Sequence, residues 1–451
     1  MVRGAAMSGN IALSPDQVSA LNAAAAWFND DARSQRPFRL FGLAGTGKST
    51  VVDRLVADIG LSKDEVIFTA TTGKAAKVLG DKGCPATTVH RAFYRCISSD
   101  EEYWGALASE RSSLGAKLTL NSKNSAATRW RERILEIDAK LRTQRPIGLE
   151  FKFTGVSNIS SAARLVVVDE ASMLDDVQFE DLCGLGIPVI LVGDHGQLPP
   201  VNGGTKVAQN IDVALETIHR QAKDSSILEI AQRARGGRGI PEGNPEIGVE
   251  VRSGGGARSV EKMIQNAGLT LEDLASADQI ICGTNNTRDE INEMMRTYLC
   301  NGQKLPTGHS NEKLMVTKNF YEDGANIMNA SFIRVTPSTV IRPRIMGLDR
   351  YIDLPVRVVD IDDEPASLYS SLWRTPFECG PKDSRRKTEQ LWARSTIQAE
   401  WGWAITAHKS QGSQWDRVCV FNESRYFRDD AKRWLYTAVT RAKRELLLIH
   451  P

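Results

Sequence analysis

The stretch FRLFGLAGTGKST, residues 38–50, decides the fold of the first half of the chain. An apolar run ends at Gly42, and Gly42-x4-Gly47-Lys48-Ser49 leads into the helical pattern GKSTVVDRLVADI. A strand, a glycine-rich loop and a helix in this order predict a phosphate-binding loop, whose N–H groups and helix N-terminus cradle phosphates. Lys48 is expected to add a positive charge at the β and γ phosphates, and Ser49 to reach Mg²⁺.

Two further strand ends carry polar residues that such a site needs. In LVVVDEAS, residues 165–172, an apolar strand delivers Asp169 to the metal and Glu170 to the attacking water. In VGDHGQLPPV, residues 192–201, Gln197 offers an amide to the γ-phosphate or to that water, and the alternative is a rigid turn. The residues therefore predict a nucleoside triphosphatase that uses Mg²⁺.

The composition is that of a soluble globular protein with room for two or three domains. The 451 residues include 57 Lys and Arg against 55 Asp and Glu, and this net charge of +2 neither requires nor excludes a polyanionic partner. The seven cysteines form no C-x-x-C pair, which argues against zinc and favours a reducing compartment. Since we find no signal-peptide or membrane-span pattern, we expect a cytoplasmic location.

Alternating strand and helix patterns predict an α/β fold with parallel sheets covered on both faces. The expected units are a first, ATP-binding domain (1–205), a second domain in two parts (206–302 and 396–451) and a β-rich module inserted into it (303–395). The Gly- and Pro-rich segment 234–259 is interpreted as loops between the domains.

The segment 95–160 interrupts this alternation. Between Arg111 and Lys152 it holds ten Lys or Arg against four Asp or Glu, and ATRWRERILEIDAKLRTQ has helical spacing. An insertion of this kind is either a solvated surface element or a nucleic-acid contact, and the sequence leaves both interpretations open.

The chain carries an ordered set of motifs: GLAGTGKST, TATTGKAAKVL, TTVHRAF, VVVDEASML, LVGDHGQLPPV, LETIHRQ, AITAHKSQGSQWDRVCV and LYTAVTRAKREL. Together these motifs resemble those of superfamily 1 helicases, above all the RecD-like and Dda-like branch. The resemblance runs from residue 14 to the C-terminus and is loose in 95–160 and 303–395. It implies two RecA-like domains with ATP between them, an SH3-like module near the strand, and 5′→3′ translocation on single-stranded DNA.

The resemblance also implies roles for individual residues in the nucleotide site. Catalysis is expected from Lys48, Glu170, Gln197, Arg220 and Arg441, with the two arginines contributed to the γ-phosphate by the second domain. Nucleotide binding is expected from Gln17, Gly45, Thr46, Gly47, Lys48, Ser49, Thr50 and Gly412, with Gln17 near the adenine. Ser49 and Asp169 are the expected Mg²⁺ ligands.

A translocating enzyme must hold a single strand through phosphate donors and flat faces for base stacking. The candidates are Thr72, Lys74, His90, Phe93, Lys318, His408, Lys409 and Ser410. Phe93 has an alternative place in the core, and core packing is the favoured interpretation for Trp401 and Trp403. Departures from the family pattern at Thr71 and at His195-Gly196 leave the path of the strand open.

These features predict an ATP-dependent DNA helicase that works as a monomer on single-stranded and tailed duplex DNA, with replication or repair proteins as possible partners. The alternatives are an RNA-directed helicase and a nucleic-acid-dependent ATPase switch that does not unwind. A small-molecule kinase would leave the motifs of residues 401–445 without a purpose. The resemblance suits a bacterial or phage-infected cell.

Overall fold

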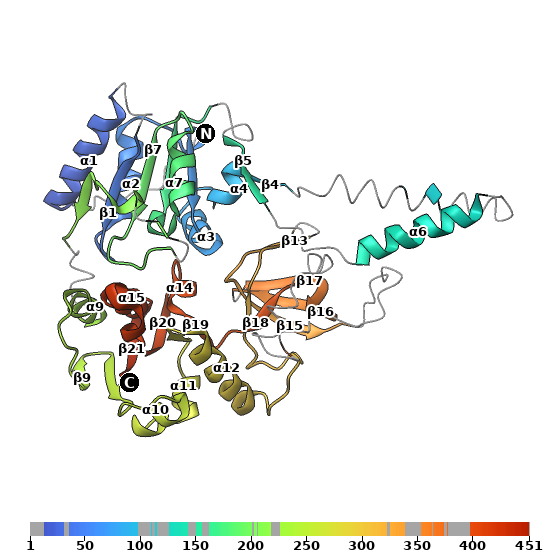
Figure 1. Cartoon of the computed structure of the whole chain (residues 1–451). Coiled ribbons are helices and arrows are strands. Elements are labelled where there is room, and N and C mark those ends of the chain that lie inside the picture. The colour runs from blue at the N-terminus through green and yellow to red at the C-terminus, as the bar shows by residue number, and fades with distance from the viewer. Residues whose placement is uncertain are drawn as a thin grey trace, which may run out of the picture.

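The structure is a computed structural model that describes residues 13–30, 36–97, 110, 113–114, 126–142, 150–155, 162–200, 203–204, 206–217, 226–322, 325–338, 353–362, 364–373, 377 and 397–450. Within these ranges the chain forms two six-stranded sheets, a five-stranded sheet and two small two-stranded ribbons (Figure 1).

The first half of the chain forms a sheet in the order β3-β2-β6-β7-β1-β8, in which every pairing is parallel. Its strands are β1 (Phe38–Gly42), β2 (Val66–Ala70), β3 (Ala86–Thr88), β6 (Leu165–Asp169), β7 (Val189–Gly193) and β8 (Val213–Leu215). Because β8 pairs with β1, this sheet continues beyond the boundary predicted at residue 205.

Helices cover both faces of the first sheet. They are α1 (Pro15–Phe28), α2 (Lys48–Asp58), α3 (Gly73–Asp81), α4 (Val89–Phe93) and α7 (Asp176–Cys183), with the short 3₁₀ turns η2 (Lys63–Glu65), η4 (Ala171–Met173) and η5 (Lys206–Ala208). One apolar core contains Phe38 and Leu55, and a second contains Phe41 and Phe93. Burial on both faces explains why the strands are apolar throughout and do not alternate.

The second sheet has the order β19-β11-β20-β21-β10-β9, and its pairings are parallel except for the edge pair β10 and β9. Its strands are β9 (Gly243–Glu246), β10 (Val249–Ser253), β11 (Gln279–Cys282), β19 (Ala404–Thr406), β20 (Trp415–Phe421) and β21 (Ala442–His450). Its helices are α9 (Ser226–Gly236), α10 (Val260–Asn266), α11 (Leu271–Ala275), α12 (Asn285–Leu299), α14 (Ala407–Ser410) and α15 (Ala431–Val439), and the 3₁₀ element η7 (Ser424–Asp430) precedes α15.

The third sheet is antiparallel and has the order β17-β16-β15-β12-β18. Its strands are β12 (Leu314–Val316), β15 (Phe332–Pro337), β16 (Asp353–Ile361), β17 (Glu364–Trp373) and β18 (Ala399–Trp401), beside a ribbon of β13 (Phe320–Glu322) and β14 (Ala325–Ile327). We call these strands the β-module. The predicted fold class, α/β with two parallel-sheet domains and a β-rich insertion, is confirmed.

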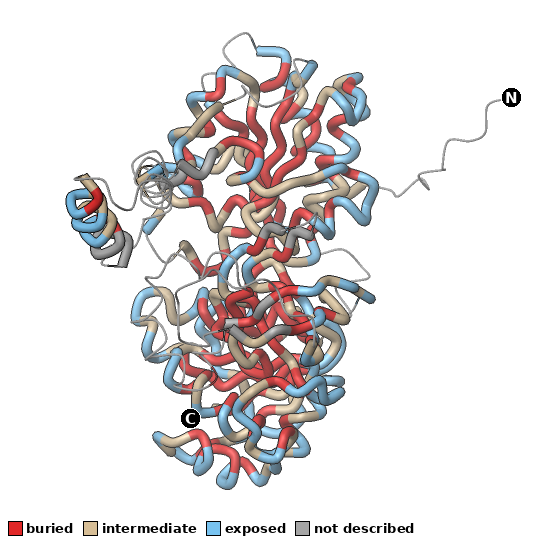
Figure 2. The backbone as a smooth tube through the Cα atoms, turned by 90° about the vertical axis from the view of Figure 1, so that its right-hand side faces the viewer, coloured by how far each residue is buried: buried red, intermediate tan, exposed pale blue. Residues whose placement is uncertain are grey.

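The basic insertion begins and ends in an antiparallel ribbon of β4 (Tyr94–Ile97) and β5 (Glu150–Phe153). Its described helix, α6 (Ala127–Arg142), lies apart from the three sheets in both views (Figures 1 and 2). Most of the segment 95–160 lies outside the described residues.

Buried residues follow the strands of the sheets, and exposed residues lie on the outer helices and loops (Figure 2). In the described ranges, no helix is both long enough and apolar enough to cross a membrane. The thiols of Cys84, Cys183, Cys282, Cys300 and Cys419 are free.

Candidate nucleotide and nucleic-acid site

The phosphate loop lies between β1 and α2, at the carboxyl edge of the first sheet. Gly45 and Gly47 have φ values of 80° and 77°, which side chains other than glycine rarely adopt. At Gly42, a Cβ atom would lie 2.6 Å from Thr46 Oγ1, so a side chain there would push into the loop. The loop thus has the close backbone curvature that a phosphate cradle requires.

Polar side chains hold this loop from inside. Lys48 Nζ donates to the carbonyl oxygens of Gly42 at 2.8 Å and Leu43 at 3.0 Å. Thr46 is buried, and its hydroxyl donates to the same Leu43 oxygen at 2.9 Å. Ser49 and Thr50 lie in the first turn of α2, where both are half-buried.

Gln17 is tied to the phosphate loop rather than free at the surface. Its Oε1 accepts from the Ser14 N–H at 3.0 Å in a capping box that starts α1, and its Nε2 donates to the Thr46 carbonyl at 3.0 Å. The predicted adenine-side residue is therefore held next to the loop by two backbone contacts. Its role toward adenine stays a prediction.

Two carboxylates lie at the end of β6. Burial raises the pKa of both Asp169 and Glu170; for Glu170 the neighbouring Asp169 raises it further, while the cations of Arg441 and Lys48 oppose the rise. Glu170 has a φ of 52° and donates its N–H to Asp169 Oδ1 at 2.9 Å. A left-handed backbone is rare for a residue other than glycine, and backbone strain of this kind clusters at functional sites.

Ser49 and Asp169 fit an Mg²⁺ ion. Both contribute to the lining of one cavity of about 20 Å³ whose other walls are largely apolar, so the fit rests on the chemistry of the two side chains. A hydroxyl and a carboxylate are hard oxygen ligands, and Mg²⁺ in phosphate sites uses one or two protein ligands together with water and substrate phosphates. In the described ranges, no cluster of three or more His, Cys, Asp or Glu offers a competing metal site.

The loop after β7 places a buried amide beside these groups. Gln197 is 7% exposed, and its Oε1 has no hydrogen-bond partner in the part of the chain that the structure describes. Asp194 is buried and accepts from the Gly196 N–H at 2.8 Å, which tightens the turn. A buried acceptor without a partner is costly, so it suits a group that bonds substrate or water.

The second domain reaches this site through α15 and the turn after it. Arg441 is 3% exposed, and its guanidinium donates to Thr437 O, Ser413 O and Thr440 Oγ1 at 2.9 to 3.2 Å. Burial lowers the pKa of Arg441, and the carboxylates of Glu170 and Asp194 oppose that change, so the cation faces the acidic side of the first domain. Arg220 lies outside the described residues.

Three residues of the second domain make contacts across the domain interface that sequence reasoning missed. Tyr436 lies between the phosphate loop and Asp194, and Thr437 Oγ1 accepts from the Leu198 N–H at 2.9 Å. Gln411 Nε2 donates to the Leu198 carbonyl at 3.0 Å. The only sequence indication was that Tyr436 and Thr437 share the LYTAVTRAK motif with Arg441.

Thr72 and Lys74 lie at the start of α3, where the three units of the fold meet. Thr72 caps the helix by accepting from the Ala75 N–H at 3.2 Å. The ammonium of Lys74 lies 5.7 Å from the ring centre of Phe332 in the β-module and 5.0 Å from that of Trp415 in the second domain. Lys74 therefore joins all three units through cation–π contacts.

Gly412 lies at the same junction. It has a φ of 73°, and a Cβ atom there would lie 2.7 Å from Thr72 Oγ1. This position is beside the start of α3, so its predicted part in nucleotide binding has no contact to the phosphate loop among the described residues. The small residue instead allows the second domain to approach Thr72 closely.

The burial of Phe93 and Ser410 corrects two predicted strand contacts. Phe93 is 0% exposed and packs in the first domain's core, so its ring cannot stack on a base. Ser410 is also 0% exposed, and its hydroxyl donates to the Ala407 carbonyl at 2.7 Å. Both side chains face inward because their short helices pack against a sheet, and a motif match does not show which face is buried.

The remaining candidates surround the same region. The Nε2 atom of His90 lies 3.2 Å from the Nε2 atom of Gln178, and burial lowers the pKa of His90. His408 packs 5.8 Å from the Phe427 ring, and burial lowers its pKa as well. Lys409 Nζ donates to Asn329 Oδ1 of the β-module at 3.3 Å, and Lys318 is exposed at the end of β12.

A groove of about 360 Å³ lies between the first domain and the β-module. Lys74, Lys77, Thr87, Thr88 and Arg91 contribute to its first-domain wall, and Met328, Ser331, Asp362 and Glu364 to its module wall. One wall is thus basic and carries two hydroxyls, while the other includes two carboxylates. The positive wall suits phosphate groups.

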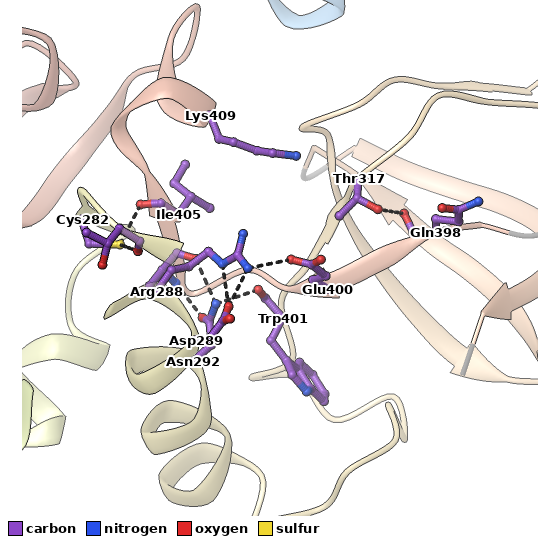
Figure 3. Close-up of polar contacts among 12 residues, drawn as sticks. Cys282, Arg288, Asp289, Asn292, Thr317, Gln398, Glu400, Trp401, Ile405 and Lys409 are labelled. Atoms are coloured by element: carbon purple, nitrogen blue, oxygen red, sulfur yellow. Dashed lines mark hydrogen bonds and ion pairs between the residues drawn. The ribbon is translucent and has the colours of Figure 1, made fainter. Parts of the chain in front are cut away.

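The β-module is anchored on the second domain where the chain returns to it (Figure 3). Arg288 of α12 pairs with Asp289 at 2.5 Å and with Glu400 of β18 at 3.3 Å. Asn292 donates to the carbonyls of Trp401 at 2.9 Å and Ala404 at 3.0 Å. Figure 3 shows Lys409 extending from α14 toward the module. The contacts that anchor the module thus lie near Lys409, one of the residues predicted to bind the DNA strand.

Two family models match the chain. The model described as AAA domain matches residues 12–243, and the model described as UvrD-like helicase C-terminal domain matches residues 402–449. The first contains the phosphate loop, Glu170 and Gln197, and the second contains Arg441. The two halves of the site thus fall within two recognised domains.

Curated relatives match over almost the whole chain. The ATP-dependent RecD2 DNA helicase of Deinococcus radiodurans is 24% identical over 449 residues, covering 96% of this chain and 48% of that protein. The RecBCD enzyme subunit RecD of Mycobacterium tuberculosis is 27% identical over 448 residues, covering 93% of this chain and 67% of that protein. The chain thus spans about half the length of the first of these relatives.

Solved structures of Pif1 helicases are also similar. The crystal structure from Candida albicans covers 97% of this chain and 94% of its own, with a TM-score of 0.46 and 15% identity. The structure from Bacteroides with ADP-AlF3 and single-stranded DNA covers 97% and 92%, with a TM-score of 0.41 and 16% identity.

Proposed function

We propose that the chain, which belongs to the AAA-domain family, is an ATP-dependent DNA helicase of the RecD-like branch of superfamily 1 that moves 5′→3′ on single-stranded DNA. One observation carries the proposal. Glu170 of the first domain lies within electrostatic reach of Lys48 and of Arg441 of the second domain, and Leu198, next to Gln197, bonds Thr437 across the same interface. Hydrolysis there is sensitive to the relative position of the domains, which a motor requires.

In the proposed reaction, Lys48 leaves its loop carbonyls and binds the β and γ phosphates of ATP. Glu170 accepts the proton of the attacking water, and its pKa, raised by burial, suits a general base. The unpartnered Gln197 oxygen orients that water. Arg441 turns from its own domain's carbonyls toward the γ-phosphate, where it stabilises the charge of the transition state.

Ser49 and Asp169 would hold Mg²⁺, which when bound supplies a Lewis acid that neutralises charge on the β and γ phosphates. The protein positions this pair by the start of α2, the helix that follows β1, and by the end of β6, which belongs to the same sheet as β1. Asp169 keeps its orientation through the Glu170 N–H, which donates to one of its oxygens.

The strand is proposed to lie across Thr72 and Lys74, along the groove beside the β-module, and over Lys409. These groups belong to all three units, so opening and closing of the ATP interface changes their spacing. Separation of one base-pair step costs about 1.4 kcal/mol, and one hydrolysis event exceeds that. The translocation step and the unwinding step are therefore energetically compatible.

The decisive experiment measures strand separation, with ATP and Mg²⁺, on two DNA duplexes that differ only in carrying a 5′ or a 3′ single-stranded tail. Opening of the 5′-tailed duplex alone is expected. Opening of the 3′-tailed duplex alone would overturn the direction. A Lys48→Ala variant, which lacks the phosphate-binding cation, should open neither duplex.

The same assay distinguishes the alternatives. Replacing the tail and the ATPase-stimulating oligomer by RNA tests an RNA-directed helicase, which would prefer the RNA substrates. ATP turnover that DNA stimulates without any unwinding would favour a nucleic-acid-dependent switch. Equal activity at dilutions well below and above micromolar concentrations would support the proposed monomer.

A further inference from the structure

The hydroxyl of Tyr436 joins two motifs of the first domain to a helix of the second. It accepts a hydrogen bond from the Ala44 N–H of the phosphate loop at 2.9 Å. It also donates to Asp194 Oδ2, after β7, at 2.9 Å. One atom of α15 thus contacts both loops that surround the reacting phosphate.

The aromatic ring of Tyr436 is fitted as closely as its hydroxyl. The residue is 2% exposed, and a Cβ atom at Gly196 would lie 2.9 Å from the ring's Cε1 atom. Gly196 thus leaves room for the ring between Asp194 and Gln197. Burial, with the Asp194 charge next, raises the pKa of the hydroxyl, so it keeps the proton that it donates.

Tyr436 also lies near the residue that crosses the interface during hydrolysis. It and Arg441 are on α15 and the turn that follows, and the Thr440 N–H donates to the Tyr436 carbonyl at 3.1 Å. A displacement of the Tyr436 hydroxyl from Ala44 therefore moves the backbone that carries Arg441.

We propose that Tyr436 is a positioning residue that couples the phosphate loop and the Asp194–Gln197 loop to Arg441, so that these groups align only when the domain interface is closed. The inference rests on the proposed function, because it concerns the same hydrolysis site. The Ala44 N–H donates to Tyr436 of the other domain and not to a phosphate, so this hydrogen bond depends on closure of the domain interface. DNA bound across both domains favours the closed arrangement and thereby accelerates hydrolysis.

The test uses Tyr436→Phe, which removes the hydroxyl and keeps the ring against Gly196. We expect kcat for ATP with saturating single-stranded DNA to fall about 10- to 100-fold, the range that misplacement of catalytic groups produces. The KM for ATP and the DNA affinity should change much less. Tyr298→Phe, at a residue that is 45% exposed on α12, is the matched control and should behave as wild type.

A second measurement separates positioning from a general structural effect. In an Arg441→Lys background, Tyr436→Phe should add little further loss, because both changes disturb the same alignment. Additive losses, or a lower melting temperature together with a raised KM for ATP or weaker DNA binding, would overturn the inference. Wild-type DNA-stimulated kcat in Tyr436→Phe would overturn it too, whereas absence of DNA-stimulated hydrolysis in the wild type would instead refute the proposed function.

Discussion

Lys77 of α3 and Glu364 of β17 form an ion pair, with 2.6 Å between Nζ and Oε1, across the groove that separates the first domain from the β-module. The hydrogen bond to Glu364 raises the pKa of Lys77, so the lysine is fully charged. Close by, Met328 of the module packs directly on Gly73. A strand that enters this groove must compete with Glu364 for Lys77.

Replacing Glu364 by Gln should therefore strengthen DNA binding. The pair is largely exposed, and exposed pairs are weak, so we expect a gain of about two- to fivefold for a single-stranded oligonucleotide at low salt. Fluorescence anisotropy over a salt series measures this, and the gain should shrink as salt rises. Glu272→Gln, on α11 outside the groove, should leave the affinity unchanged; a loss of affinity in Glu364→Gln would mean that the strand takes another path.

Glu170→Gln should abolish hydrolysis while ATP and DNA still bind. The amide preserves the shape of the buried side chain and cannot accept the proton of water, so we expect kcat to fall about 10²- to 10⁴-fold. Steady-state turnover and titration with a fluorescent ATP analogue measure the two effects. Glu261→Gln, an exposed change on α10, is the control. Turnover at the wild-type rate would remove Glu170 from the role of base.

Arg441→Lys should lower kcat with little effect on DNA affinity measured without nucleotide. Lysine keeps a positive charge but lacks the planar guanidinium, and arginines that reach a γ-phosphate contribute about 10³- to 10⁵-fold. Arg444→Ala, whose side chain is 77% exposed, should leave turnover unchanged. If Arg441→Lys lost DNA binding and kept its turnover, Arg441 would belong to the strand-binding surface instead.

Phe93→Ala should lower stability and leave the DNA affinity of the folded protein unchanged. A fully buried phenylalanine contributes to a packed core, and its truncation costs about 3–5 kcal/mol. Urea denaturation followed by circular dichroism measures the loss, and anisotropy below the unfolding transition measures binding. Lys74→Ala is the comparison, because it should weaken DNA binding with little effect on stability. Weaker binding in a fully stable Phe93→Ala would return this ring to the strand.

Stability should fall as pH drops below about 6.5, the ordinary pKa of histidine. Burial lowers the pKa of His90, His195, His408 and His450, so the unfolded chain binds protons that the folded chain does not. The contribution of the four neutral rings is complete above that pH and is lost progressively on acidification. Urea denaturation at about pH 7.5 and about pH 5.5 measures it. His450→Gln should show a smaller decrease than wild type.

Much of the nucleotide site could be predicted because its residues follow strands. Lys48, Asp169 and Gln197 each come after an apolar run, and parallel strands end at the same edge of a sheet. The helix that follows the glycine-rich loop further restricts where Lys48 and Ser49 can lie. Local patterns and the order of the strands were enough to place these groups together.

The strand-binding residues were predicted less well. Phe93 and Ser410 belong to recognisable motifs, yet α4 and α14 are short, and only packing against the sheets decides which of their faces is buried. Gly412 was assigned to nucleotide from its motif, whereas its contact with Thr72 depends on how the second domain meets α3. For such residues the same sequence pattern is compatible with either face.

By itself, the sequence determined the α/β class, the phosphate loop and the carboxylates at the end of β6, because hydrophobic patterning and glycine conformations act over a few neighbouring residues. Only the tertiary structure decided that Tyr436 contacts Ala44 and that Lys77 pairs with Glu364. The two residues of each pair are hundreds of positions apart in the sequence. A polar contact between two single residues produces no repeating hydrophobic or polar pattern, so the sequence around them does not indicate it. Their meeting follows from the packing of three separately formed units.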